Sequence, residues 1–130
     1  MNSAEKSSCR NAPLQELENL DELWFQVGGT LCNLSCNHCF ISCHPGNDNF
    51  GFIDLETVRR YLRESQALGV KEYYFTGGEP FLNRDMLPVL EETLAIGPAT
   101  VLTNGTVFTP SSVKALRAIS EESLYSLEMR

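Results

Sequence analysis

One stretch of the chain, VKEYYFTGGEP at residues 70–80, joins a strand pattern directly to a tight turn. Its first half is rich in aromatic residues and ends at Phe75, as expected of a buried β-strand. Gly77 and Gly78 lack side chains and let the backbone approach a ligand closely, while Pro80 stiffens the exit from the turn. We therefore predict a strand that delivers a ligand-binding turn at its carboxyl end.

The same arrangement of strand and helix recurs along the chain. Asp54 and Gly69 are suited to begin and end a helix, Asp85 to begin a second helix and Pro110 to lie in the first turn of a third. Further strands are predicted at residues 23–27, 99–102 and 124–128. The order β-α-β-α-β-α-β predicts an α/β fold with parallel strands and right-handed crossovers.

Polar and metal-binding residues follow the predicted strands. Functional sites in such folds form at the carboxyl ends of the strands. The features expected at this rim are the loop after residues 23–27, the turn at Gly77-Gly78-Glu79-Pro80, the Asn104-Gly105 turn and Glu128. We therefore expect one composite site.

Cys32, Cys36 and Cys39 form a CxxxCxxC pattern in the first of these loops. Three thiolates in a short irregular loop can hold an iron-sulfur cluster and leave its fourth iron open to another ligand. The alternative is a structural zinc site that combines three of the nearby cysteines, Cys43 included, with His38 or His44. Such zinc sites usually have a second, distant ligand pair, and none follows His44.

Composition narrows the classes of function. The 130 residues are 42% hydrophobic and 21% charged, as in ordinary globular proteins, and the net charge of -7 disfavours nucleic acid as a partner. Five cysteines, an odd number, and a polar start at residues 1–6 indicate no disulfide framework and no secretory signal. No apolar run reaches the roughly 18–20 residues of a membrane span. We expect a cytoplasmic protein with no membrane partner.

The cysteine loop after a first strand and the GGEP turn after a second together resemble the radical S-adenosylmethionine (radical SAM) superfamily, from about Leu23 to Glu128. The resemblance implies a [4Fe-4S] cluster on Cys32, Cys36 and Cys39, whose open iron binds S-adenosyl-L-methionine. It also implies reductive cleavage of this cosubstrate to methionine and a 5′-deoxyadenosyl radical, which abstracts hydrogen from a substrate.

The resemblance implies further roles for residues of the rim. His38 would lie against the adenine, and the turn formed by Gly77, Gly78, Glu79 and Pro80 would contact the methionine amino group. Asn104, Ser126 and Glu128 would bind the ribose hydroxyls or the carboxylate. The plainer alternatives are a loop histidine, ordinary turns and a solvated strand end. Cys9 and Cys43 are assigned no role.

The family core is usually a partial barrel of six β/α units, whereas this sequence supplies three units and one further strand. We expect a partial (β/α) barrel truncated after the fourth parallel strand, with a flexible leader at 1–20 that ends in a short helical turn and a half-barrel core at 21–130. An open fourth strand favours self-association or pairing with another chain. The sequence therefore suggests an N-terminal fragment or a half barrel.

The predicted function is that of a radical SAM enzyme, or of its cluster-bearing part, in peptide modification or cofactor maturation. Its partners would be a peptide or small-molecule substrate and a reducing electron donor, and the isolated chain would be inactive without strands five and six. The alternative is a non-catalytic iron-sulfur or zinc-binding α/β interaction module.

Overall fold

A four-stranded parallel sheet forms the centre of the fold, and the computed structural model describes residues 13–39 and 42–130. The strands, in sheet order, are β1 (Glu22–Phe25), β2 (Glu72–Phe75), β3 (Ala99–Val101) and β4 (Leu127–Met129). The connections carry α2 (Leu55–Leu68), the 3-10 helix η1 (Pro80–Leu82), α3 (Met86–Thr93) and α4 (Pro110–Glu122). The predicted α/β class, a partial sheet of four parallel strands with crossover helices, is confirmed.

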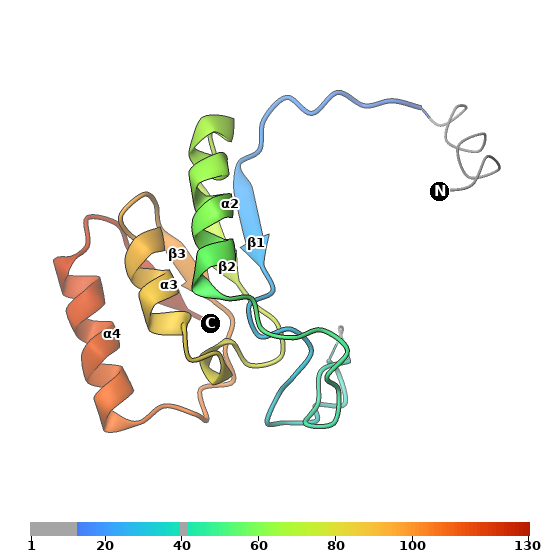
Figure 1. The fold of residues 1–130 in the computed structure, drawn as a ribbon, viewed down its shortest axis with the longest axis vertical. Helices are drawn as coiled ribbons and strands as arrows, with labels where there is room; N and C mark the ends of the chain where they lie inside the picture. The colour runs from blue at the N-terminus through green and yellow to red at the C-terminus, as the bar shows by residue number, and fades with distance from the viewer. Residues whose placement is uncertain (1–12, 40–41) are drawn as a thin grey trace.

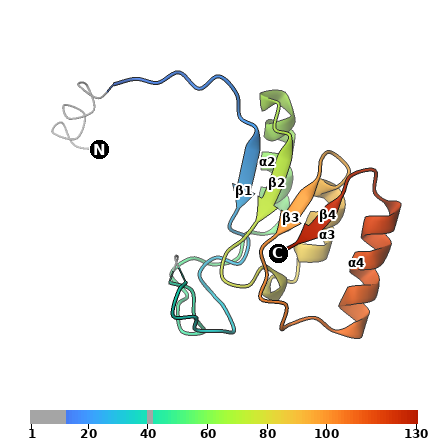
Figure 2. The same cartoon turned by 180° about the vertical axis from the view of Figure 1, so that it is seen from behind.

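The three α-helices cover one face of the sheet (Figures 1 and 2). Phe25, Phe75 and Val101 are aligned across β1, β2 and β3, and all three are buried. The helices contribute apolar side chains to the same core, among them Val58, Leu62, Val89, Leu90 and Leu116. None of the described helices is long and apolar enough to cross a membrane.

The opposite face of the sheet carries the alternate residues of each strand. Trp24, Tyr74, Thr100 and Glu128 are aligned across it, and the rings of Trp24 and Tyr74 stack with centroids 4.3 Å apart. The described helices leave this face uncovered (Figure 2), and Trp24 is 50% exposed. In a (β/α) barrel this is the face that lines the interior. We call it the bare face.

The capping residues predicted for α2 are found at its ends, whereas the residue predicted to cap α3 makes a different contact. Hydrogen bonds from the Thr57 side chain and from its backbone N–H, which donates to the Asp54 carboxylate at 2.8 Å, hold the pKa of Asp54 below its usual value. Gly69 ends α2 in the left-handed conformation. Asp85 occupies the N-cap position of α3, but its carboxylate accepts from the Leu55 N–H at 3.1 Å. The residue predicted to cap one helix therefore joins the starts of two.

The fourth strand begins later than predicted. After α4 ends, Ser123 has extended backbone and Leu124 is 97% exposed, because residues 123–126 cross from the helix layer back to the sheet. The Ser126 carbonyl makes the first bond to β3, accepting from the Ala99 N–H at 3.0 Å. Glu128 consequently lies in the middle of β4 and not at its end.

The predicted leader is described only from residue 13 onward. Residues 13–21 contain no helix, so the short helical turn expected from Leu14, Leu17 and Leu20 is wrong for this part of the chain. Leu14 and Leu17 are exposed and gain nothing from helical spacing, because no surface packs against them. Cys9 lies outside the described residues.

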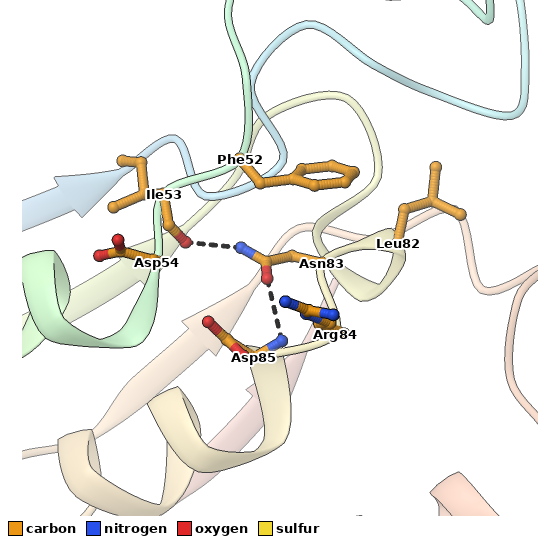
Figure 3. A pocket seen from close by; sticks show the side chains of 7 residues that line it. All are labelled: Phe52, Ile53, Asp54, Leu82, Asn83, Arg84 and Asp85. Atoms are coloured by element: carbon orange, nitrogen blue, oxygen red, sulfur yellow. Dashed lines mark hydrogen bonds between the residues drawn. The ribbon is translucent and has the colours of Figure 1, made fainter.

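Asn83 joins three segments near the site end of the sheet (Figure 3). Its amide group donates to the carbonyls of Val27 at 3.0 Å and Ile53 at 2.7 Å, and its side-chain oxygen accepts from the Asp85 N–H at 2.9 Å. These partners lie after β1, at the end of the cysteine loop and at the start of α3. One buried amide thus fixes both ends of the cysteine loop against a helix.

Replacing Asn83 by alanine should therefore leave three buried or half-buried backbone groups without their partner. We expect the free energy of unfolding to fall by about 1–3 kcal/mol, measured by urea titration of the whole chain. The exposed Asn49→Ala is the matched control and should change it by less than about 0.5 kcal/mol. Equal losses in both variants would contradict this role.

Candidate functional site

The loops after β1 and β2 run side by side beyond the end of the sheet. The Gly78 N–H donates to the Gly29 carbonyl at 2.9 Å, and the Glu79 N–H donates to the Leu31 carbonyl at 3.1 Å. A Cβ atom on Gly78 would lie 1.8 Å from the Leu31 oxygen, and Gly77 has a φ of +136°. The two glycines are therefore required for the cysteine loop to dock on the turn.

Glu79 ties a third loop to this pair. Its side chain is fully buried, and its carboxylate accepts from the Thr103 hydroxyl at 2.5 Å, the Asn104 N–H at 2.8 Å and the Phe81 N–H at 3.3 Å. A buried carboxylate needs such donors to offset its loss of hydration. These contacts hold the loop after β3 against the turn after β2.

The loop after β3 also reaches the cysteine loop directly. The Asn104 amide group donates to the Asn33 side-chain oxygen at 2.9 Å and to Cys32 Sγ at 3.7 Å, and the Asn33 amide donates to the Thr106 hydroxyl at 2.7 Å. The three loops are thus joined pairwise by hydrogen bonds. Their common side forms a hollow.

The hollow has a volume of about 340 Å³ and is lined by residues from the segments that follow all four strands. It is lined by Cys36, His38, Cys39, Thr76, Gly77, Gly78, Leu102, Thr103, Asn104 and Arg130. Six of the residues predicted for the composite site therefore face one space. Glu79 and Pro80 lie behind it, both buried.

A second hollow of about 390 Å³ lies beside Asn83 (Figure 3). Its lining comes from residues 52–54 and 82–85 and includes no cysteine or histidine. Asn83 and the carboxylates of Asp54 and Asp85 are engaged with backbone N–H and carbonyl groups around the helix starts. The hollow that contains the cysteines is slightly smaller, but it holds the reactive groups, and we place the site there.

The three thiols differ in their surroundings. Cys32 is 9% exposed, Cys39 is half-buried and Cys36 is exposed. The backbone N–H of Cys43 donates to Cys39 Sγ at 3.3 Å. Within the part of the chain that the structure describes, the sulfur atoms of Cys32 and Cys39 therefore accept hydrogen bonds from other residues.

Within residues 13–39 and 42–130, no three His, Cys, Asp or Glu side chains are grouped closely enough to hold a single metal ion. A tetrahedral zinc site would require such a group. A cubane cluster binds each thiolate at a different iron and so spaces its ligands more widely. Cys36 and Cys39 line the hollow, and Cys32 contacts Asn104, which also lines it, so this loop has three thiols that would suit such a cluster.

Cys43 lies behind this loop, with Sγ 3.9 Å from the Gly29 carbonyl oxygen. Burial, reinforced by the neighbouring Cys39 and Cys32 thiols, raises the pKa of Cys43 to about 11. A group with so high a pKa is a neutral thiol at pH 7, so Cys43 behaves as a small buried side chain. His44 is engaged locally, its Nδ1 accepting from the Gly46 N–H at 3.1 Å.

Ser126 and Glu128 lie apart from the cysteine hollow. They line a smaller space of about 120 Å³ on the bare face, together with Tyr74 and Thr100. Arg130 borders both spaces. Its guanidinium donates to the two carboxylate oxygens of Glu128 at 2.9 and 3.3 Å, which raises the pKa of Arg130 and lowers that of Glu128.

Arg130 was missed in the sequence analysis. Its only signal is a cationic side chain two residues beyond Glu128, and that signal was hidden because the fourth strand was predicted three residues too early. Its backbone lies at the rim, where its carbonyl accepts from the Thr103 N–H at 2.8 Å. Arg130 therefore brings a positive charge to the lining of the hollow that also contains Cys36 and Cys39.

The close contact at Gly78 makes a direct prediction. Gly78→Ala should push the cysteine loop away and lower the free energy of unfolding by about 1–3 kcal/mol, because the new methyl group meets backbone atoms that cannot rotate aside. Gly51→Ala is the control, since a Cβ there has no neighbour within 4 Å. Urea titration measures both, and a Gly78→Ala variant as stable as Gly51→Ala would contradict the contact.

A family model and individual known proteins both match this chain. The family model described as the Radical SAM superfamily matches residues 27–125. A GTP 3′,8-cyclase from Synechococcus sp. (strain WH7803) is 33% identical over an alignment of 113 positions that covers 73% of this chain and 32% of that protein. A second, from Klebsiella pneumoniae subsp. pneumoniae, is 39% identical over an alignment of 80 positions that covers 58% of this chain and 24% of that protein.

The solved structure of BtrN in an open conformation aligns with a TM-score of 0.60 at 16% identity. The alignment covers 88% of this chain and 58% of that one, and at this identity it supports the fold alone. The chain spans about a third or less of the length of the curated relatives named above. The residues matched by the family model, 27–125, contain the cysteine loop and the turn after β2.

Proposed function

Because this chain belongs to the radical SAM superfamily, whose members use a [4Fe-4S] cluster and S-adenosylmethionine, we propose that it binds both. Cys32, Cys36 and Cys39 are the proposed iron ligands. When bound, the cluster and cosubstrate supply reductive cleavage to methionine and a 5′-deoxyadenosyl radical, which takes a hydrogen atom from a substrate. The chain's own residues bind, orient and shield these groups.

One observation carries the proposal. Cys36 and Cys39, from the loop after β1, share a hollow with Gly77 and Gly78, from the turn after β2. A cluster held by the cysteines would present its open iron to a space bordered by bare backbone. Backbone carbonyl groups without flanking side chains suit the ammonium group of an amino acid. The turn is therefore the proposed partner of the methionine amino group.

Glu79 supports this turn from behind. Its carboxylate is buried and accepts three hydrogen bonds from Phe81, Thr103 and Asn104, so its contribution to the site is to hold the turn in place. Pro80 begins the 3-10 helix η1 directly after it and stiffens the exit. His38 borders the same hollow and is the proposed neighbour of the adenine.

We propose that Ser126 and Glu128 contribute to the site indirectly, through Arg130. Neither residue borders the cysteine hollow, but Glu128 holds the Arg130 guanidinium through two hydrogen bonds, and Arg130 borders it. A guanidinium is the side chain best matched to a carboxylate. We propose that Arg130 binds the cosubstrate carboxylate, with Glu128 fixing its orientation and Ser126 lining the adjoining space.

The family requires a substrate and a reductant, and their identities remain proposals. We propose a small-molecule substrate bound against the bare face, where Trp24, Tyr74 and Thr100 are accessible. The curated relatives are named for a reaction of GTP, which favours a small molecule over a peptide, but the aligned part is a minority of their length. The proposal also includes a cytoplasmic location and self-association through β4. It divides the chain into a leader at 1–20 and a core at 21–130.

Anaerobic reconstitution with iron and sulfide tests the proposal. The reduced chain should give a [4Fe-4S] electron paramagnetic resonance signal that changes when S-adenosylmethionine is added, with about four irons per chain. Cys36→Ala should lose at least half of the bound iron and the response to the cosubstrate. Cys43→Ala, which removes a nearby thiol outside the proposed ligand set, should keep both.

The non-catalytic interaction module predicts a different result. It would bind iron or zinc without releasing 5′-deoxyadenosine when dithionite and S-adenosylmethionine are supplied. Detection of 5′-deoxyadenosine by liquid chromatography supports the enzyme. A cluster signal indifferent to both the cosubstrate and Cys36→Ala would refute the proposed site.

A further inference from the structure

Asn104 is held in one orientation by its hydrogen bonds. Its side-chain oxygen accepts from the Thr106 N–H at 3.0 Å and the Thr106 hydroxyl at 2.7 Å. Its amide nitrogen donates to Asn33 Oδ1 at 2.9 Å and to Cys32 Sγ at 3.7 Å. The two donors at Thr106 fix which end of the carboxamide is oxygen, so the nitrogen must face the sulfur.

The same contacts use the full capacity of this side chain. A carboxamide offers two N–H donors and one oxygen with two lone pairs, and all four positions have partners within the chain. In this arrangement no donor or lone pair of the Asn104 side chain is therefore left for the ribose or carboxylate of a cosubstrate. Its position favours another function, directed at the cysteine loop.

The sulfur that Asn104 contacts is the most buried of the three proposed ligands. Cys32 is 9% exposed, whereas Cys36 is exposed to solvent. Charge on a buried sulfur is poorly hydrated, so a fixed donor there has a larger electrostatic effect than it would have in water. The backbone N–H of Asn104 is itself anchored on the buried Glu79 carboxylate at 2.8 Å, which keeps the donor in place.

We propose that Asn104 is a positioning residue that donates its amide N–H to Cys32 Sγ and thereby raises the reduction potential of the cluster held by the cysteine loop. This inference rests on the proposed function. Hydrogen bonds to the sulfur ligands are among the factors that set iron-sulfur potentials, because they stabilise the more negative, reduced state. Removing the donor should therefore make the potential more negative.

The test compares reconstituted wild-type chain with Asn104→Asp and Asn104→Leu. Asn104→Asp keeps the shape and the oxygen that Thr106 contacts, but replaces the donor with a negatively charged oxygen. Asn104→Leu removes all the side-chain hydrogen bonds at a similar size and keeps the backbone N–H that donates to Glu79. An anaerobic redox titration followed by electron paramagnetic resonance should give a more negative midpoint for both variants, with the larger shift for Asn104→Asp.

Thr106→Val is the matched control. It removes a hydroxyl from the same group of hydrogen bonds but leaves the Asn104 donor and the Thr106 N–H in place. If Asn104 had a purely structural role, Thr106→Val and Asn104→Leu would shift the midpoint potential in the same way. The inference predicts that Thr106→Val keeps the wild-type midpoint. Resonance Raman spectra should show a higher iron–cysteine stretching frequency in Asn104→Leu and Asn104→Asp, and an unchanged frequency in Thr106→Val.

The outcomes separate this inference from the proposed function. Equal midpoints in wild type, Asn104→Asp and Asn104→Leu, with the cluster intact and the cosubstrate still cleaved, would overturn the inference and leave the function standing. Absence of a cluster from the wild-type chain would overturn both. If Asn104→Leu fails to hold a cluster, the midpoint of the isosteric Asn104→Asp decides, and an unchanged value there counts against the inference.

Discussion

The contact between Gly78 and the backbone of Leu31 is the constraint on which the site depends. Two polypeptide segments can approach this closely only where one of them has no side chain, because a single methyl group at Gly78 would meet the Leu31 oxygen at 1.8 Å. The approach lets the parallel hydrogen-bonding pattern of β1 and β2 continue beyond the sheet, through Gly29 and Leu31. The cysteine loop thereby starts from a rigid base.

Burial of Glu79 extends that base to the third loop. A carboxylate with no exposed surface is costly unless donors surround it, and here the donors come from η1 and from the loop after β3. The Glu79 carboxylate therefore stabilises the arrangement of the loops, in addition to being part of the GGEP motif. It makes the position of Asn104 depend on the same turn that borders the hollow, so the two sides of the site are set together.

Local features could be predicted from the sequence, and pairings across long separations could not. Asp54 caps the start of α2 and Gly69 its end, as expected, because each acts within one helical turn. Asp85 instead binds Leu55, thirty positions away, and Asn104 reaches Cys32 across 72 positions. Such partners are chosen by the packing of whole elements, which no local pattern encodes. The rule that sites form at strand ends still located the cysteine loop, the Gly77-Gly78 turn and Asn104 together.

The three cysteines cannot be distinguished by the CxxxCxxC spacing, but the fold gives each of them a different environment. Cys32 is buried and follows the docked segment at Leu31, with an amide donor on its sulfur, whereas Cys36 is exposed further along the loop. Cys39 lies between these extremes and accepts a backbone N–H. A cluster on this loop would therefore be anchored at one rigid corner and closed by the outer part of the loop. Since Cys36 and Cys39 line the hollow and Cys32 does not, the outer part of the loop borders the space available to a ligand, while the buried Cys32 end stays attached to the turn.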